Sequence, residues 1–351
     1  MDDLSNAKRV VRDFTTRFDL ETADARIDIC AQHCAADYRW RGVHPFHEQP
    51  DAAGAIRAFW SPFLTSFSNV QRREDVFFAG LNDCDDQSSV WTCSMGHLMA
   101  LFDHSWLGIP ATRKIAMLPY AEFHRIENGK IAETAFFCDI LRVAGQAGLY
   151  PLPQQTAADM VNPGPRTNDG LLLGHHDPAE GAQTLALVNR MAADISRANR
   201  LLNGEIELTN FTPRDELAAN WHEDMAWYGP TGIGATYTID RYIEQHQQPF
   251  RKHLANRIFH GHVARVAEGN YCGFFGWPNL SVTPIGGYMG LPATGKPAPM
   301  RVVDVYRRDG DKLAENWVFI DLLHWLNVQG LDVLGRIAAM NSENLMQIRR
   351  A

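Results

Sequence analysis

Two pairs of carboxylates stand where neighbouring β-strands are predicted, one pair in each half of the chain. Asp304 and Asp321 form one pair, and Glu122 and Asp139 form the other. If both acids of a pair face the same apolar cavity, loss of water and mutual repulsion raise the pKa of at least one of them. An acid and a base then coexist at neutral pH, which is what proton-transfer chemistry needs.

Neutral hydrogen-bond donors accompany these acids. By alternation along the strand, Tyr306 shares a face with Asp304, and His124 shares a face with Glu122. Such a donor can stabilise an enolate while a carboxylate moves the proton, so an aldol or retro-aldol reaction needs no cofactor here. The alternative is that these acids face outward and form surface ion pairs with arginines. The predicted catalytic residues are Asp321, Asp139, Asp304, Glu122, His124 and Tyr306.

Aromatic side chains near these acids indicate the kind of ligand. Counting back in steps of two from each closing aspartate places aromatic residues on the same strand face as the acid. A wall of such rings favours an aromatic or polycyclic small molecule, although most tryptophans are otherwise expected in a core. The predicted substrate-binding residues are Trp40, Trp227, Tyr228, Trp317, Phe137 and Phe319.

Clustered histidines raise the alternative of a metal-dependent oxygenase or hydrolase. His260 and His262 flank one glycine on a predicted strand, so both rings would face one side, and four more crowd the first half: His44, His47, His97 and His104. The positions that match His260 and His262 in the first half are Arg73 and Asp75, and the chain has no His-Glu-x-x-His motif. We therefore expect no metal and no other cofactor.

The elements that must position these residues occur twice in the chain. Residues 224–229 (Asp-Met-Ala-Trp-Tyr-Gly) restate residues 37–42 (Asp-Tyr-Arg-Trp-Arg-Gly) at an offset of 187. Later motifs match at an offset of 182: residues 290–296 restate 108–114, and Lys-Leu-Ala-Glu at 312–315 restates Lys-Ile-Ala-Glu at 130–133. Self-similarity of this kind indicates one fold duplicated in tandem.

Each copy is predicted to begin with helices and to continue with strands. In the first copy, helical spacing covers residues 5–36, a short strand follows at 37–42, a helix at 52–67, and four β-rich runs at about 70–80, 87–102, 112–126 and 131–140. A second copy repeats this order from a long helix at about 180–202. Prolines and glycines crowd residues 151–179, so we expect domains at 1–150 and 180–351 joined by a linker.

Helices followed by a run of antiparallel strands are typical of an α+β fold. We expect two tandem cone-shaped barrels, each a curved and mostly antiparallel sheet wrapped around its N-terminal helices. Such a cone has an open mouth that a small molecule can enter. Glycine-rich nucleotide-binding signatures are absent, which argues against dinucleotides and nucleoside triphosphates.

The repeated motifs resemble those of the SnoaL-like polyketide cyclases, which share the fold of nuclear transport factor two and ketosteroid isomerase. The resemblance covers about residues 10–150 and 210–340, with the second copy matching better. It implies a cone-shaped barrel and metal-free acid–base chemistry at a substrate carbonyl. It also implies that the general acid or base is the aspartate ending the last strand, Asp139 or Asp321, with a partner on the strand before it, His124 or Tyr306.

Composition bounds the remaining possibilities. The chain has 351 residues, a formal charge of −8 and 45% hydrophobic residues, values typical of a globular protein and unfavourable for nucleic-acid binding. No run reaches the roughly 20 apolar residues of a membrane helix. Six scattered cysteines without a Cys-x-x-Cys pair favour a reducing, cytoplasmic setting. Self-association into a homo-oligomer is plausible for this fold.

Together these patterns predict a cofactor-independent lyase, cyclase or isomerase that acts on an aromatic or polycyclic small molecule. A second hypothesis is a ligand-binding or scaffolding protein without catalysis, because a fold alone does not establish an activity. The metal-dependent oxygenase or hydrolase remains a third.

Overall fold

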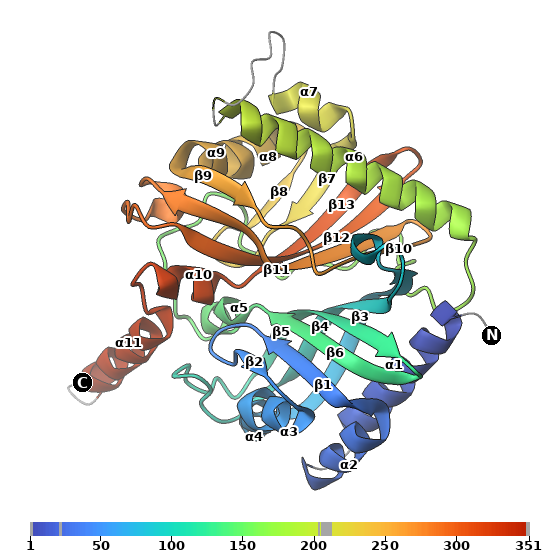
Figure 1. The fold of residues 1–351 in the computed structure, drawn as a ribbon. Helices are drawn as coiled ribbons and strands as arrows, with labels where there is room; N and C mark the ends of the chain where they lie inside the picture. The colour runs from blue at the N-terminus through green and yellow to red at the C-terminus, as the bar shows by residue number, and fades with distance from the viewer. Residues whose placement is uncertain (1–2, 21–22, 203, 205–212, 349–351) are drawn as a thin grey trace. The chain divides into compact units, whose positions relative to one another are not determined.

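The computed structural model describes residues 3–20, 23–202, 204 and 213–348. The chain divides into two compact units. Unit 1 comprises Met1–Leu152, Asn168–Gly174 and Asp321–Ala351, and unit 2 comprises Pro153–Thr167 and His175–Ile320. Each unit contains one mixed β-sheet with its own helices (Figure 1).

Unit 1 carries a sheet in the order β2-β1-β6-β5-β4-β3, in which only the β1–β6 pair is parallel. Its strands are β1 (Cys34–Gly42), β2 (Glu48–Gln49), β3 (Phe67–Leu81), β4 (Val90–Phe102), β5 (Ile115–Glu127) and β6 (Lys130–Cys138). Its helices are α1 (Asp3–Leu20), α2 (Ala23–His33), α3 (Ala52–Ala55), η1 (Ile56–Trp60), α4 (Ser61–Ser66), η2 (Asp83–Asp85), α5 (Ile140–Gln146), α10 (Leu322–Val328) and α11 (Val333–Ile348).

Unit 2 carries a sheet in the order β10-β11-β12-β13-β7-β8, with β9 paired to β11 and only the β13–β7 pair parallel. Its strands are β7 (Trp221–Tyr228), β8 (Ala235–Tyr237), β9 (Leu254–Phe259), β10 (Ala264–Glu268), β11 (Tyr271–Pro284), β12 (Ala298–Asp309) and β13 (Lys312–Ile320). Its helices are α6 (Pro178–Leu202), α7 (Pro213–Ala218), α8 (Ile239–Tyr242), η3 (Ile243–Gln247), α9 (Gln248–His253) and η4 (Tyr288–Gly290).

Local sequence explains the main elements. Helix α6 buries Leu187, Val188 and Met191, which recur at helical spacing, and it packs along β10 and β11. The glycine that ends the first shared motif has a steric reason: a Cβ at Gly229 would lie 2.2 Å from the ring of Trp227. The equivalent Gly42 is constrained in the same way by its own tryptophan two residues earlier. The motif is therefore a packing unit in both copies.

The structure confirms the α+β class and the duplicated order of elements. One difference is that the first long strand of the second copy is interrupted, because β9 ends at Phe259 and β10 begins at Ala264. Another is that the sheets are not closed, so each unit is an open curved sheet instead of a barrel.

The segment predicted as a linker is held by hydrogen bonds. In unit 1, the backbone N–H of Phe77 donates to the carbonyl of Gly170. In unit 2, the indole N–H of Trp317 donates to the carbonyl of Pro163 at 2.8 Å. The C-terminal residues from Asp321 onward belong to unit 1, although the repeat places them at the end of the second copy.

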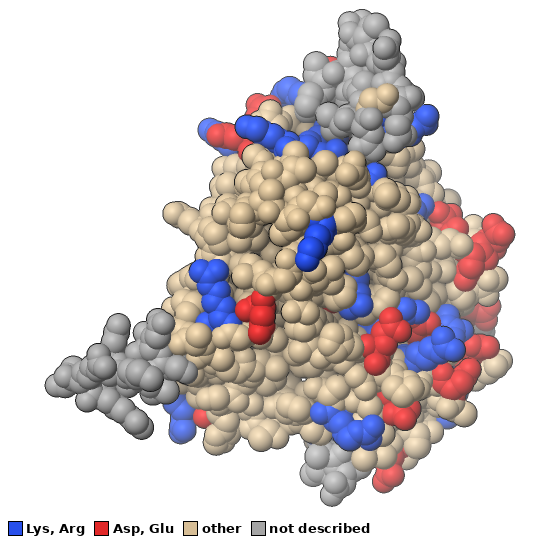
Figure 2. All heavy atoms as spheres, turned by 60° about the vertical axis from the view of Figure 1, so that its left-hand side comes forward, with Lys and Arg blue, Asp and Glu red and all other residues tan. Residues whose placement is uncertain are grey.

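The surface carries charges of both signs. On the face shown in Figure 2, acidic and basic side chains are interspersed.

Within the described residues, no helix combines the length and apolar character needed to cross a lipid bilayer.

Candidate active site

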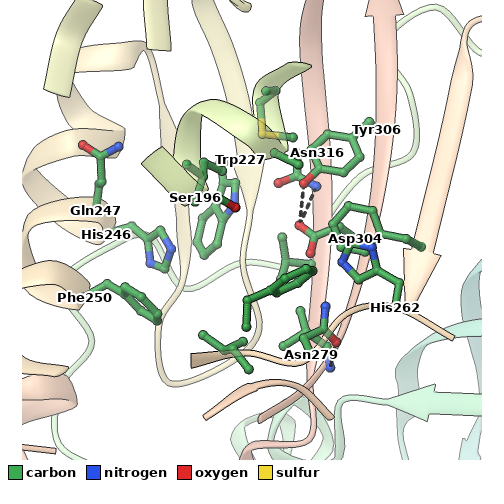
Figure 3. A pocket seen from close by; sticks show the side chains of 18 of the residues that line it. Ser196, Trp227, His246, Gln247, Phe250, His262, Asn279, Asp304, Tyr306 and Asn316 are labelled. Atoms are coloured by element: carbon green, nitrogen blue, oxygen red, sulfur yellow. Dashed lines mark hydrogen bonds between the residues drawn. The ribbon is translucent and has the colours of Figure 1, made fainter. Parts of the chain in front are cut away.

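Unit 2 contains a cavity of about 430 Å³ between its helices and its sheet. Its wall is mainly apolar by area, which is usual for a small-molecule site, and its polar side chains include the guanidinium groups of Arg251 and Arg265. Side chains reach it from α6, from the α8–η3–α9 helix and from strands β9 to β13 (Figure 3). The apolar lining includes Met191, Leu217, Phe250, Met300, Val302, Val318 and Ile320.

Asp304 lies on β12 in the wall of this cavity, where its side chain is half-buried. Its Oδ1 accepts hydrogen bonds from the Tyr306 hydroxyl at 3.1 Å and from the Asn316 amide at 3.2 Å (Figure 3). Removal from bulk water raises the pKa of Asp304 to about 6, although the two hydrogen bonds favour the ionised form. Asp304 therefore changes its charge close to neutral pH.

Strand alternation places Tyr306 and Asn316 beside Asp304. Tyr306 follows two residues later on the same face of β12, and Asn316 lies directly opposite Tyr306 on β13. The Asn316 amide also donates to the Val305 carbonyl at 3.1 Å, which fixes its orientation. Because both donors use Oδ1, the second carboxylate oxygen has no protein hydrogen bond within the described residues. That oxygen can meet a ligand.

His262 reaches the same part of the cavity from the segment between β9 and β10. Its ring stacks on Phe274 with 3.9 Å between ring centroids, and Phe274 is the β11 residue opposite Asp304. Burial and the neighbouring Arg265 guanidinium lower the pKa of His262 to about 3, so the imidazole is neutral at pH 7. Arg265 Nη2 donates to His262 Nδ1 at 2.7 Å, which leaves the proton on Nε2.

A second neutral imidazole, His246, lies on the π-helical turn η3. Its ring stacks on Trp227 at 4.0 Å and is flanked by Tyr242. Burial and the charge of Arg251 lower the pKa of His246 to about 3. Its Nδ1 is buried and has no hydrogen-bond partner in the described part of the chain.

The cavity thus combines one carboxylate that titrates near neutrality, neutral donors next to it, and two arginines, Arg251 and Arg265, in a mainly apolar wall. Such a carboxylate can remove a proton from a carbon next to a carbonyl and return it to an oxygen. A neutral N–H such as that of His262 can stabilise the negative charge formed in between.

Asp321 and Asp139 do not line this cavity. Each caps the N-terminus of the helix that follows the last strand of its copy: Asp139 Oδ1 accepts from the N–H of Arg142, and Asp321 Oδ1 accepts from the N–H of His324. Asp321 is also buried within unit 1, where both oxygens accept from the backbone N–H of His44 at 3.0 and 3.1 Å. Within the described fold, the side chains of Asp139 and Asp321 therefore serve as helix caps and accept backbone hydrogen bonds.

The predicted wall residues of β13 lie on its other face. The cavity is lined by Asn316, Val318 and Ile320, whereas Trp317 and Phe319 alternate away from it. The prediction assumed that Asp321 faces the cavity and counted back from it along β13. Asp321 instead caps the following helix, so the residues counted back from it were placed on the cavity face when they lie on the opposite face. Tyr228 stacks on Trp317 at 5.6 Å and shares this other face. Trp227 is the predicted wall residue that does line the cavity.

In unit 1 the predicted site residues are packed inside the core. Glu122 and His124 are 3% and 0% exposed, and Glu122 accepts from Arg72 Nη1 at 2.9 Å. Burial alone would raise the pKa of Glu122, but the charges of His124 and Arg72 outweigh it and lower the pKa to about 2. Trp40 is stacked against Phe136, and Phe137 is fully buried on the opposite face of β6. This carboxylate stays ionised at neutral pH and is held by a cation.

The histidines of the metal hypothesis are not gathered at one place. Residues 260–263 form no strand, so the prediction that both rings face one side was wrong. His260 is exposed and pairs with the hydroxyl of Ser281 at 2.8 Å, while His262 faces the cavity. Among the described residues, no three His, Cys, Asp or Glu side chains are arranged to hold a metal ion.

Sequence reasoning missed Asn316 and His246 as site residues. Both could have been found by comparing the copies, because Asn316 matches Thr134 at the offset of 182 and His246 matches Phe59 at the offset of 187. A position that is more polar in the second copy than in the first indicates that the interior of the second copy has a different lining.

No protein-family model matches the chain, and no curated protein matches it in sequence. Solved structures do match. An NTF2-like protein from Burkholderia xenovorans is 14% identical, covers 42% of this chain and 97% of that chain, and has a TM-score of 0.32. A protein from Shewanella denitrificans assigned to the SnoaL-like polyketide cyclases is 16% identical, covers 44% of this chain and 100% of that chain, and has a TM-score of 0.33.

A further protein from Jannaschia with the same SnoaL-like assignment is 16% identical, covers 41% of this chain and 94% of that chain, and has a TM-score of 0.30. Each of these structures corresponds in length to one copy of the duplicated fold. The similarity is one of fold.

Proposed function

We propose that unit 2 is a cofactor-independent acid–base enzyme, a lyase, cyclase or isomerase of aldol or retro-aldol type. Its substrate is an aromatic or polycyclic small molecule, and Asp304 moves the proton. The observation that supports this most directly is the half-buried carboxylate of Asp304. It lies in a mainly apolar cavity, and its pKa is raised to about 6. No cation among the described residues stabilises its ionised form.

In the forward direction, ionised Asp304 removes a proton from the carbon next to a substrate carbonyl. The carbon–hydrogen electron pair becomes an enolate, which the N–H of His262 stabilises at its oxygen. The enolate carbon then attacks a second carbonyl of the substrate and forms a carbon–carbon bond. The resulting alkoxide takes the proton from Asp304, which returns to its carboxylate form, so no external acid, base or cofactor is consumed.

Tyr306 and Asn316 are positioning residues in this scheme. Their hydrogen bonds hold Oδ1 and direct the other oxygen toward the cavity. They also oppose the effect of desolvation, so the pKa stays near 6 and the ionised base is available at pH 7.

The test is a mass-resolved screen of phenolic and polyketide-like compounds with the full chain. We look for products of equal mass or with loss of water or of a small aldehyde. With any compound that reacts, Asp304→Asn should lower kcat/KM by roughly 10² to 10⁴-fold, the usual contribution of a general acid–base group. Below about pH 6, kcat/KM should fall roughly tenfold per pH unit as Asp304 becomes protonated.

Glu122→Gln is the matched control because it neutralises the equivalent acid of unit 1. It should leave kcat/KM unchanged. A Glu122→Gln variant that loses activity while Asp304→Asn retains it would contradict the assignment to unit 2. If compounds bind to unit 2 and none is converted, the non-catalytic binding protein replaces the enzyme.

A further inference from the structure

One part of the cavity wall in unit 2 has no role in the proton transfer by Asp304, namely the side chains that α8 and η3 contribute. Tyr242 from α8 and His246 from η3 both line the cavity, and their ring centroids lie 5.3 Å apart. Because the two positions differ by four, they lie on the same side of the helix. Figure 3 shows the imidazole of His246 beside Trp227 and Phe250. Tyr242 and His246 thus form a polar pair among aromatic rings.

The first copy carries apolar residues at the same two positions. At the offset of 187, Tyr242 matches Ala55 and His246 matches Phe59. The π-helical turn is present in both copies, as η1 and as η3, so it does not require a histidine. Phe59 is fully buried against the aromatic rings of unit 1. The fold therefore forms without the hydroxyl and the imidazole, which only the copy with the open cavity carries.

The protein leaves both polar groups without a partner. Within the described residues, neither the hydroxyl of Tyr242 nor the ring nitrogens of His246 have a hydrogen bond, and Nδ1 of His246 is buried. Nε2 is the nitrogen that a ligand can reach. Because buried N–H groups without an acceptor are rare, we place the proton of the neutral imidazole on Nε2. Stacking on Trp227 at 4.0 Å fixes the plane of the ring and the direction of this donor.

The two donors are uncharged. Burial and the charge of Arg251 keep the pKa of His246 at about 3, and burial raises the pKa of Tyr242, so both side chains are neutral at pH 7. Arg251 is itself paired, since its Nη2 lies 2.7 Å from both oxygens of Glu216. A carboxylate placed here would find the charge of Arg251 already compensated. Two neutral donors suit a neutral acceptor such as a ketone oxygen.

We propose that Tyr242 and His246 bind the carbonyl that the enolate attacks, so that the substrate of the forward reaction is an aromatic compound with two carbonyl groups. This inference rests on the proposed function of unit 2. As the enolate carbon forms the carbon–carbon bond, the π electrons of the attacked carbonyl move to its oxygen. The Nε2–H of His246 and the hydroxyl of Tyr242 stabilise this alkoxide until it takes the proton from Asp304.

The test uses benzophenone, an aryl ketone without a hydrogen on the carbons next to its carbonyl, so that Asp304 has no proton to remove. Diphenylmethane is the matched probe because it keeps both rings and lacks the carbonyl. Calorimetric titration of the full chain gives the two dissociation constants. Infrared spectroscopy of isotope-labelled benzophenone reports hydrogen bonds to the bound ketone, which should lower its carbonyl band below the position found in a hydrocarbon solvent.

His246→Phe introduces the residue of the first copy and removes one donor. It should weaken benzophenone binding roughly threefold to tenfold relative to diphenylmethane, the effect of one neutral hydrogen bond, and should raise the carbonyl band. The free energy of unfolding should not fall, because phenylalanine fills this position in unit 1 and the buried unpaired nitrogen is removed. Tyr242→Phe keeps its ring and should give the same pattern, so the test does not depend on one variant.

The proposal is overturned if benzophenone does not bind to the wild type, or if both variants change the affinities of the two probes equally. A carbonyl band that moves in His262→Phe and stays in place in His246→Phe would locate the ketone at the other imidazole and would also overturn it. None of these readouts requires turnover. The activity of Asp304→Asn therefore tests the proposed function separately.

Discussion

The interiors of the two units differ although their folds are copies. In unit 1, Phe136 lies at the centre of an aromatic cluster, with Phe59 at 4.7 Å, Trp60 at 5.6 Å and Tyr120 at 6.1 Å between ring centroids. The residue that matches Phe136 in unit 2 is Val318, and the residue that matches Tyr120 is Val302. Loss of these two rings leaves room for the cavity of about 430 Å³.

The same difference applies to the acids. Glu122 and Asp304 are matched residues, yet Glu122 is paired with Arg72 and Asp304 has only neutral donors. A buried acid next to a cation is a structural group, whereas an acid held in an apolar cavity by neutral donors can exchange protons at neutral pH. The comparison shows that two copies of one fold can differ in whether the interior around matched acids is filled by aromatic rings or left open as a cavity.

The largest effect on stability should follow from breaking the ion pair of unit 1. Glu122→Gln leaves the buried Arg72 guanidinium with less compensating charge, so we expect a loss of about 3 kcal/mol in the free energy of unfolding. Urea denaturation followed by tryptophan fluorescence measures it. Asp304→Asn is the matched control and should lose no stability at pH 7. Equal losses of unfolding free energy in the two variants would contradict the view that Glu122 is held by an ion pair and Asp304 is not.

The two acids should also respond to pH in opposite directions. Because removal from water raises the pKa of Asp304 from 3.8 to about 6, the folded state holds this proton more tightly, and stability falls as pH rises between those values. The pKa of Glu122 is lowered from 4.5 to about 2, so its contribution is present above about pH 4.5 and is lost as pH falls toward 2. Each of these two changes in pKa corresponds to about 3 kcal/mol in the free energy of unfolding.

Denaturation curves of Asp304→Asn and Glu122→Gln from pH 3 to 8 check this pattern. Relative to wild type, Asp304→Asn should gain stability above about pH 6, and Glu122→Gln should approach wild type at the acid end. Parallel profiles for the two variants would contradict it.

Exchanging the central residue between the units tests the packing. Phe136→Val should open a cavity in unit 1 and cost somewhat less than the roughly 3–5 kcal/mol of a Phe→Ala change in a core. Val318→Phe should instead fill the cavity of unit 2 and abolish binding of an environment-sensitive apolar dye. Thermal unfolding and dye titration measure the two outcomes. Undiminished dye binding in Val318→Phe would show that the dye occupies another site.

The smallest effect should come from the other face of β13. Trp317→Phe removes the indole hydrogen bond to Pro163, which contributes roughly 0.5–1.5 kcal/mol, and keeps most of the apolar packing. Activity and dye binding should stay at the wild-type level because Trp317 does not line the cavity. A large loss of dye binding in Trp317→Phe, with stability unchanged, would show that Trp317 does contribute to the wall of the cavity.

Parts of the site could be predicted from alternation alone. Asp304 and Tyr306 share a face of β12 because strand alternation is a property of the backbone, and they do meet in the cavity. Asp321 could not be placed in this way. Its side chain accepts from the backbone N–H of His324, and a residue that caps a helix has left the alternation of the preceding strand. Every residue counted back from it was therefore assigned to the wrong face.

The amino-acid sequence by itself determined the duplication, the α+β order of elements and the residue types available to each interior. Repeats, periodicity and composition are properties of neighbours along the chain, so they can be recognised without coordinates. Only the tertiary structure decided which interior is filled and which is open, and which of the two matched acids has a cation beside it. Those outcomes depend on which side chains from distant segments come into contact. Desolvation and packing are set by these contacts and cannot be read from the order of residues along the chain.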